Sequence, residues 1–200
     1  MNCLINKFLI MTNIVLFASG SGSNVENIAK FFEKDENITI SHILTNNPDA
    51  FVIERAKKLG IPCKVFSRQE LNKDYAILNF LTKTGVDLIV LAGFLWLIPV
   101  EITKAFPDKI INIHPALLPK YGGKGMYGAR VHEAVVENRE KESGITIHYV
   151  NEKYDEGNVI FQAKCQVLPD DTPDDVAAKI HELEYKYFPE VIKQLIYSAK

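Results

Sequence analysis

Short apolar runs alternate with amphipathic stretches along most of the chain. The runs are rich in β-branched residues, which is typical of strands that are buried on both faces of a sheet. They predict strands at 13–18, 38–44, 64–66, 87–92 and 110–113. The stretches between them repeat apolar residues three and four positions apart, as one face of a helix does. They predict helices at 23–32, 50–60, 71–84, 99–106 and 131–137.

The last third of the chain has a different pattern. Residues 144–150 and 159–167 alternate between apolar and polar positions, which predicts two antiparallel strands at the edge of the sheet. Residues 171–196 then predict a long helix, with Asp171 or Thr172 as its N-cap and Pro173 in its first turn. The order of the elements predicts an α/β fold with a doubly wound, mostly parallel, Rossmann-like sheet and antiparallel edge strands.

The composition is that of one globular domain. The chain has 200 residues, of which 47 % are hydrophobic and 24 % charged, and its formal net charge is −2. We expect residues 1–10 to be an N-terminal extension and residues 11–200 to form the domain. The charge balance predicts no nucleic-acid partner, and the lack of an 18-residue apolar run predicts no membrane segment. Three widely spaced cysteines favour a cytoplasmic location.

A glycine-rich loop follows the first predicted strand. The segment 19–24 reads Ser-Gly-Ser-Gly-Ser-Asn and leads into a helix, whose free N–H groups and dipole favour an anion. Val25 stands where a dinucleotide-binding motif has its third glycine, and the second strand does not end in an acidic residue. The loop therefore favours a single phosphate, with a sugar attached, over NAD. The alternative is a tight strand-to-helix turn that binds no ligand.

A second motif lies at the end of the strand at 110–113. Alternation along this strand places Asn112 and His114 on the same side, where an amide and an imidazole could stabilise a developing oxyanion. Asp155, between the last two strands, is the candidate third member, because its carboxylate could raise the pKa of His114 and relay protons. The alternatives are a structural histidine at a strand end and an aspartate that only forms a turn.

The other histidines lack the additional ligands that a metal site needs. His132 and His148 are accompanied by no HExxH motif and no carboxylate triad, so we expect no metal. Alternation predicts that His148 and His42 lie at the surface or at an edge of the sheet.

These motifs together resemble those of the folate-dependent formyltransferases. The resemblance rests on the 20–24 loop, on Ala-Gly-Phe at 92–94, on Asn-x-His-Pro-x-Leu-Leu-Pro at 112–119 and on Asp-x-Gly at 155–157, and it runs from Met11 to Ile196. It is strongest with the members that formylate glycinamide ribonucleotide. The resemblance implies that 10-formyltetrahydrofolate is the co-substrate. It also implies that Asn112 and His114 stabilise an oxyanion, that His114 donates a proton, and that Asp155 keeps His114 protonated.

The resemblance also implies two binding regions. Residues that would hold the ribonucleotide are Gly22, Ser23, Asn24, His181 and Glu184. Residues that would contact the folate are Arg68, Leu95, Trp96, Leu97, Ile98 and Asn112. Three features depart from the family pattern: Trp96 replaces a frequent arginine, His181 replaces a frequent glutamine, and the 122–128 loop is unusually rich in glycine.

Two other kinds of function remain open. A methionyl-tRNA formyltransferase normally carries an additional C-terminal domain and a formyltetrahydrofolate hydrolase an additional N-terminal one, and 200 residues leave room for neither. A non-catalytic nucleotide- or folate-binding protein would not need Asn112, His114 and Asp155 together. We therefore expect small-molecule substrates as the only partners, and a monomer or weak homodimer.

Overall fold

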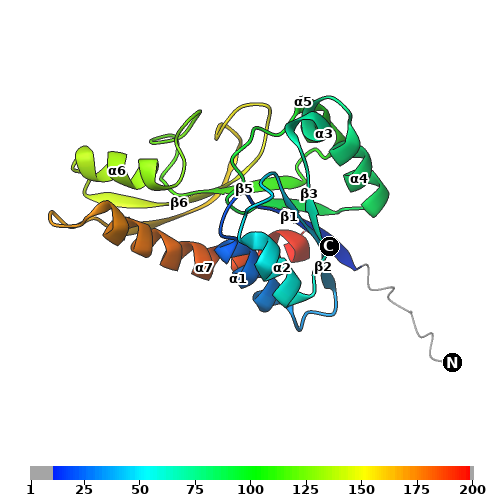
Figure 1. Ribbon diagram of the computed structural model, residues 1–200. Helices are drawn as coiled ribbons and strands as arrows, with labels where there is room; N and C mark the ends of the chain where they lie inside the picture. The colour runs from blue at the N-terminus through cyan, green and yellow to red at the C-terminus, as the bar shows by residue number, and fades with distance from the viewer. Residues whose placement is uncertain (1–10, 199–200) are drawn as a thin grey trace.

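The computed structural model describes residues 11–198 as a seven-stranded sheet with helices on both faces (Figure 1). The strands are β1 (Thr12–Phe17), β2 (Ile38–Thr45), β3 (Cys63–Val65), β4 (Leu88–Leu91), β5 (Ile110–His114), β6 (Glu142–Tyr149) and β7 (Val159–Gln166). Their spatial order is β3-β2-β1-β4-β5-β6-β7. The first five are parallel, whereas β6 is antiparallel to β5 and β7 antiparallel to β6. The predicted fold class is confirmed, and the extension at 1–10 lies outside the described residues.

The helices cover the sheet as two layers, each with its own apolar core. They are α1 (Ser23–Phe32), α2 (Val52–Leu59), α3 (Arg68–Asn72), α4 (Ala76–Thr84), α5 (Val100–Ala105), α6 (Ala129–Glu137) and α7 (Pro173–Ser198). Strand β1 contributes to both cores: Ile14 and Leu16 pack with α1, α2, α6 and α7, while Val15 and Phe17 pack with α3, α4 and α5. This alternation explains why the strand is apolar throughout. No helix within residues 11–198 is both long and apolar enough to cross a bilayer.

The helix predicted at 71–84 is in fact two helices. Ser67 and Glu70 form a capping box, in which each side chain bonds the other's backbone N–H, and this starts α3 three residues earlier than predicted. The break follows at Tyr75, whose φ of 52° is left-handed and therefore incompatible with a continuous helix. The apolar periodicity continues across the break, which is why the sequence pattern conceals it.

The last two strands are antiparallel as predicted, but only β7 forms the edge. Strand β6 lies between β5 and β7, and its residue His148 is only 2 % exposed. His42 on β2 is half-buried, with its ring centroid 4.9 Å from that of Phe80. The prediction of a surface or edge position is therefore wrong for His148, because alternation along a strand cannot reveal a neighbouring strand or a covering loop.

The topology brings the loops that follow β1, β4 and β5 together at the carboxyl ends of the parallel strands. The chain continues from β1 outward to β2 and β3, and then returns to β4 on the other side of β1. Ligands bind at such a reversal in open α/β sheets, beyond the carboxyl ends of the strands. Ser19, after β1, joins the loops across this point: its N–H donates to the Gly93 carbonyl (3.0 Å), and its Oγ accepts from the Leu95 N–H (3.0 Å).

Candidate active site

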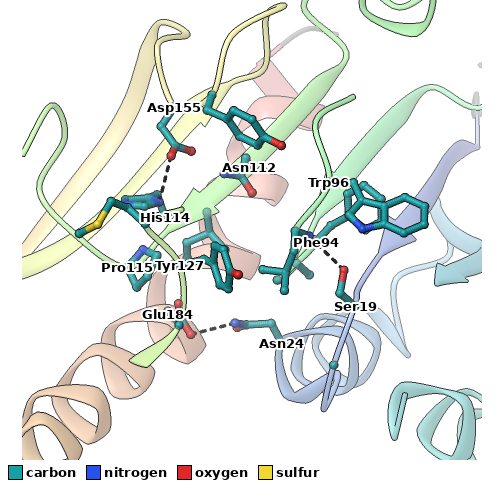
Figure 2. Close-up of a pocket in the computed structure, with 18 of the residues that line it drawn as sticks. Ser19, Asn24, Phe94, Trp96, Asn112, His114, Pro115, Tyr127, Asp155 and Glu184 are labelled. Atoms are coloured by element: carbon teal, nitrogen blue, oxygen red, sulfur yellow. Dashed lines mark hydrogen bonds and ion pairs between the residues drawn. The ribbon is translucent and has the colours of Figure 1, made fainter. Parts of the chain in front are cut away.

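A cavity of about 700 Å³ lies at this reversal point (Figure 2). Its walls are the loop after β1, the turn after β4, the end of β5, the 123–128 loop, residues 154–155 and one turn of α7. Small-molecule sites in proteins usually enclose several hundred Å³. The cavity thus brings together three of the predicted groups: the catalytic trio, the glycine loop and the residues of the last helix.

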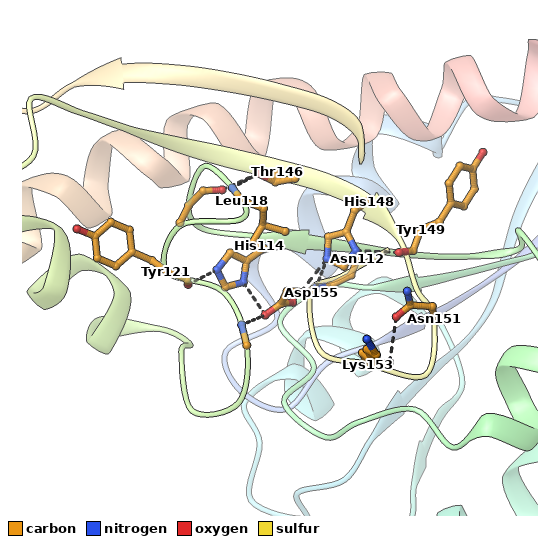
Figure 3. Close-up of polar contacts among 12 residues, drawn as sticks. Asn112, His114, Leu118, Tyr121, Thr146, His148, Tyr149, Asn151, Lys153 and Asp155 are labelled. Carbon is orange, nitrogen blue, oxygen red and sulfur yellow. Dashed lines mark hydrogen bonds and ion pairs between the residues drawn. The ribbon is translucent and has the colours of Figure 1, made fainter. Parts of the chain in front are cut away.

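His114 is held on both sides of its ring (Figure 3). Its Nε2 lies 2.7 Å from the Tyr121 carbonyl oxygen, and its Nδ1 lies 3.5 Å from Oδ2 of Asp155. A backbone carbonyl can only accept, so Nε2 carries a proton and donates it to Tyr121. Since Pro115 follows directly and the side chain is only 4 % exposed, the ring is fixed at the end of β5.

Burial lowers the pKa of His114 below its ordinary value. The Asp155 charge and the Tyr121 carbonyl act in the opposite direction, but burial is the larger effect. The sequence-based expectation that Asp155 raises this pKa is therefore correct for the effect of Asp155 and wrong for the net result. The lowered pKa favours the neutral imidazole of His114 at neutral pH, with the Asp155 carboxylate beside it.

Asp155 is more than a turn residue. It has a left-handed φ of 56°, and its Oδ2 accepts the Gly123 N–H at 2.9 Å while Oδ1 lies 3.6 Å from His148 Nε2. Burial acts to raise the pKa of Asp155. The contacts with His148, His114 and Gly123 outweigh burial and hold that pKa below the usual range, so the carboxyl is ionised at neutral pH.

His148 supports the site from outside the cavity lining, and the sequence interpretation missed it. It lies on β6 directly opposite Asn112 on β5. Its Nδ1 donates to the Tyr149 carbonyl (2.8 Å), which leaves Nε2 to accept from Asn112 Nδ2 at 3.1 Å. His148 thus fixes the orientation of the Asn112 amide while it also faces Asp155 (Figure 3). Only the pairing register of β5 with β6 reveals this.

We expect the His148→Phe substitution to lower kcat about tenfold to a hundredfold with little change in KM, because Asn112 loses the partner that orients its amide. His148→Gln should recover part of kcat, since a glutamine can accept the same hydrogen bond. The measurement is steady-state kinetics, with His42→Phe as a matched control, because His42 packs on Phe80 and not on Asn112 or Asp155. Equal losses in His148→Phe and His42→Phe would contradict a positioning role.

The loop after β1 presents unpaired donors to the cavity. The backbone N–H groups of Ser21, Gly22, Ser23 and Asn24 have no acceptor within residues 11–198, and all four residues line the cavity. Gly22 adopts a φ of 73°, and a Cβ on it would lie 2.4 Å from Cγ2 of Val52. Only glycine fits there. Unpaired N–H groups at the start of a helix are suited to bind an anion, so this loop is a candidate anion site.

The last helix completes this end of the cavity. Glu184 is only 6 % exposed and accepts from Asn24 Nδ2 (2.9 Å) and from His181 Nδ1 (3.0 Å). Its hydrogen bond raises the pKa of His181, whose side chain is exposed. The sequence placed His181 and Glu184 on one helical face, and the structure adds that Asn24 joins them to the anion site.

The opposite end of the cavity is aromatic. The Arg68 guanidinium lies 4.4 Å from the centroid of Trp96, and Phe94 packs against the same indole. Arg68, Leu95 and Trp96 line the cavity, whereas two of the predicted folate-contacting residues do not. Ile98 is buried in the core with α3, α4 and α5, and the Leu97 N–H donates to the hydroxyl of Tyr154 (3.1 Å).

The sequence did not assign several other cavity residues. They are Ser19, Met126, Tyr127, His132 and Tyr154. Most lie on loops, where no periodicity indicates which side chains point inward. No group of three or more His, Cys, Asp or Glu side chains in the described part of the chain could hold a metal ion.

Comparison with known proteins identifies the family of this chain. Residues 12–192 match the family model described as formyl transferase. The chain belongs to this family. It is 38 % identical to phosphoribosylglycinamide formyltransferase of Haemophilus influenzae, covering 92 % of this chain and 86 % of the relative. It is 41 % identical to the chloroplastic phosphoribosylglycinamide formyltransferase of Arabidopsis thaliana, with 90 % of this chain covered, and spans only 63 % of that relative's length.

Solved structures of the family have the same fold. The phosphoribosylglycinamide formyltransferase of Anaplasma phagocytophilum aligns with a TM-score of 0.85 at 34 % identity, covering 94 % of this chain and 88 % of its own. The enzyme of the same name from Streptococcus pneumoniae aligns with a TM-score of 0.82 at 37 % identity, covering 93 % and 99 %. These formyl transferases are therefore similar to this chain over nearly its whole described length.

Proposed function

We propose that this chain transfers the formyl group of 10-formyltetrahydrofolate to the amine of glycinamide ribonucleotide, a step of purine biosynthesis. The observation that carries the proposal is the placement of Asn112, His114 and Asp155 in one cavity with an unpaired anion site, in a chain of the formyl transferase family.

Asn112 and His114 stabilise the charge that develops on the formyl oxygen. When the amine attacks the formyl carbon, the carbonyl becomes a tetrahedral centre with a negative oxygen, which donors fixed in advance stabilise best. Asn112 Nδ2 has a second N–H available beyond the one it gives to His148. The His114 Nε2–H becomes available when the formyl oxygen takes the place of the Tyr121 carbonyl.

Asp155 and His114 assist the proton transfers that the reaction requires. The attacking amine must lose a proton, and the folate nitrogen must gain one as its bond to the formyl carbon breaks, so the reaction neither consumes nor releases a proton overall. The growing oxyanion raises the proton affinity of His114, and Asp155 stabilises the imidazolium that results. Asp155 is suited to this because its own pKa is held low by fixed contacts.

The two ends of the cavity suit the two substrates. The unpaired N–H groups of residues 21–24 suit the phosphate of the ribonucleotide, and Glu184 suits its ribose hydroxyls as a hydrogen-bond acceptor. Leu95, Phe94 and Trp96 offer an apolar surface to the folate ring system, and Arg68 offers a cation to its carboxylate tail.

The test is an activity assay with three acceptors in parallel. We expect the purified protein to consume 10-formyltetrahydrofolate rapidly with glycinamide ribonucleotide. With initiator methionyl-tRNA, or with water alone, we expect consumption at least about a hundredfold slower, because neither places a reactive amine over the anion site. Product identity is established by mass spectrometry of the formylated ribonucleotide. Turnover with tRNA, hydrolysis at an equal rate, or no turnover at all would each overturn the proposal.

A further inference from the structure

The first turn of α2 contacts the glycine loop at three consecutive residues, Gly20, Ser21 and Gly22. The Val52 N–H donates to the Gly20 carbonyl at 3.1 Å, and Arg55 Nε donates to the Ser21 carbonyl at 2.8 Å. The Val52 side chain also packs so closely on Gly22 that no Cβ fits there. One helix thus fixes two successive peptide groups of the loop and the backbone of the next residue.

These contacts determine where the amide protons of the loop point. In a trans peptide the carbonyl and the N–H that follows it point in opposite directions. With the Gly20 and Ser21 carbonyls turned toward α2, the N–H groups of Ser21 and Gly22 must point away from α2. Both of those residues line the cavity, and neither N–H has an acceptor within residues 11–198.

Arg55 is well suited to hold one of these peptides. Its guanidinium forms an ion pair with Glu26 on α1 and lies 5.1 Å from the centroid of the Phe51 ring. Its Nε–H is the donor to Ser21. The guanidinium therefore already has protein partners on α1, on the loop and beside α2. Arg55 is also not among the residues that line the cavity. A direct contact with a substrate phosphate is therefore not its role.

We propose that Arg55 is a positioning residue for the phosphate of the ribonucleotide, which acts by holding the Ser21 peptide so that the Gly22 N–H faces the cavity. The inference rests on the proposed function, because it takes the loop as the phosphate site. It adds a residue outside the cavity to the determinants of substrate affinity, and it assigns that residue to one substrate only.

The test uses Arg55→Met and Arg55→Lys in the full chain, with Lys30→Met as the matched control. Lys30 also forms an ion pair with Glu26, at 2.6 Å, but does not contact the loop. We expect Arg55→Met to raise the KM for glycinamide ribonucleotide about tenfold, the usual scale for losing a hydrogen bond from a charged donor. The kcat and the KM for 10-formyltetrahydrofolate should stay within twofold, and ribose 5-phosphate should bind correspondingly more weakly by calorimetry. Lys30→Met should change none of these values.

Arg55→Lys separates geometry from charge. Lysine keeps the charge but has no planar fork to reach Ser21 and Glu26 together, so we expect most of the KM defect to persist. Wild-type KM in Arg55→Lys, or an equal rise in the KM of both substrates in Arg55→Met, would overturn the inference. If Arg55→Met does not fold, Glu26→Gln, which weakens the anchor of the guanidinium, should still raise only the ribonucleotide KM. A wild-type chain without activity on the ribonucleotide refutes the proposed function instead.

Discussion

The His114→Ala substitution should lower kcat by at least about a thousandfold. It removes both a hydrogen-bond donor to the oxyanion and the imidazole that takes part in proton transfer. Glycinamide ribonucleotide should still bind within about threefold of its wild-type affinity, because the anion site and Glu184 are untouched. The two measurements are single-turnover kinetics and titration calorimetry with the ribonucleotide. Together they separate a chemical role of His114 from a role in binding.

The matched variant is His114→Gln, whose amide can still donate a hydrogen bond but cannot hold the proton. We expect it to recover about tenfold over alanine and no more, since the proton-transfer contribution stays lost. The thermal unfolding midpoints of both variants are compared with that of the wild type, to show that a loss of kcat does not come from misfolding. A folded His114→Ala protein that keeps more than about a tenth of the wild-type kcat would refute the catalytic assignment.

The Asp155→Asn substitution should lower kcat about a hundredfold to a thousandfold and displace its pH dependence toward acid. In the native protein the Asp155 charge raises the pKa of His114 against the effect of burial. Without that charge the pKa of His114 falls further, so the imidazolium is lost at a lower pH. The alkaline limb of kcat, above which His114 cannot be protonated, should move to lower pH. The measurement is a pH profile of kcat at saturating substrates.

The control is Asp170→Asn, which removes a carboxylate from an exposed turn outside the cavity. It should leave both kcat and the pH profile unchanged. A lower kcat with an unmoved alkaline limb would mean that Asp155 acts by holding the Gly123 N–H, and an unchanged kcat would remove it from the proton path altogether.

The fold was predictable because its signals are local. Short apolar runs, helical periodicity and the glycine loop gave the strand order along the chain and placed Asn112 and His114 on one face of β5. The break between α3 and α4 was missed, although Ser67 and Glu70 three positions apart are a recognisable capping box. Local patterns in the sequence are thus sufficient to place the helices and strands when every capping signal is included.

The rest of the site depends on contacts distant in the sequence. His148 is a site residue only because β6 pairs with β5 in a register that sets it opposite Asn112. The direction of the His114 pKa shift depends on how completely the fold buries the ring, which no pattern of residue types encodes. Ile98 belongs to the core for the same kind of reason, although Leu97 directly before it is exposed.

Ser19 links two of the loops that line the cavity. Its two hydrogen bonds tie the segment that begins the anion site to the segment that carries the aromatic surface, across a single pair of strands. A nucleophile anchored on one side and an acyl donor anchored on the other would then meet at a separation built into the scaffold. The hydrogen bonds of one residue at the end of β1 thus hold together two loops between which the formyl group would pass.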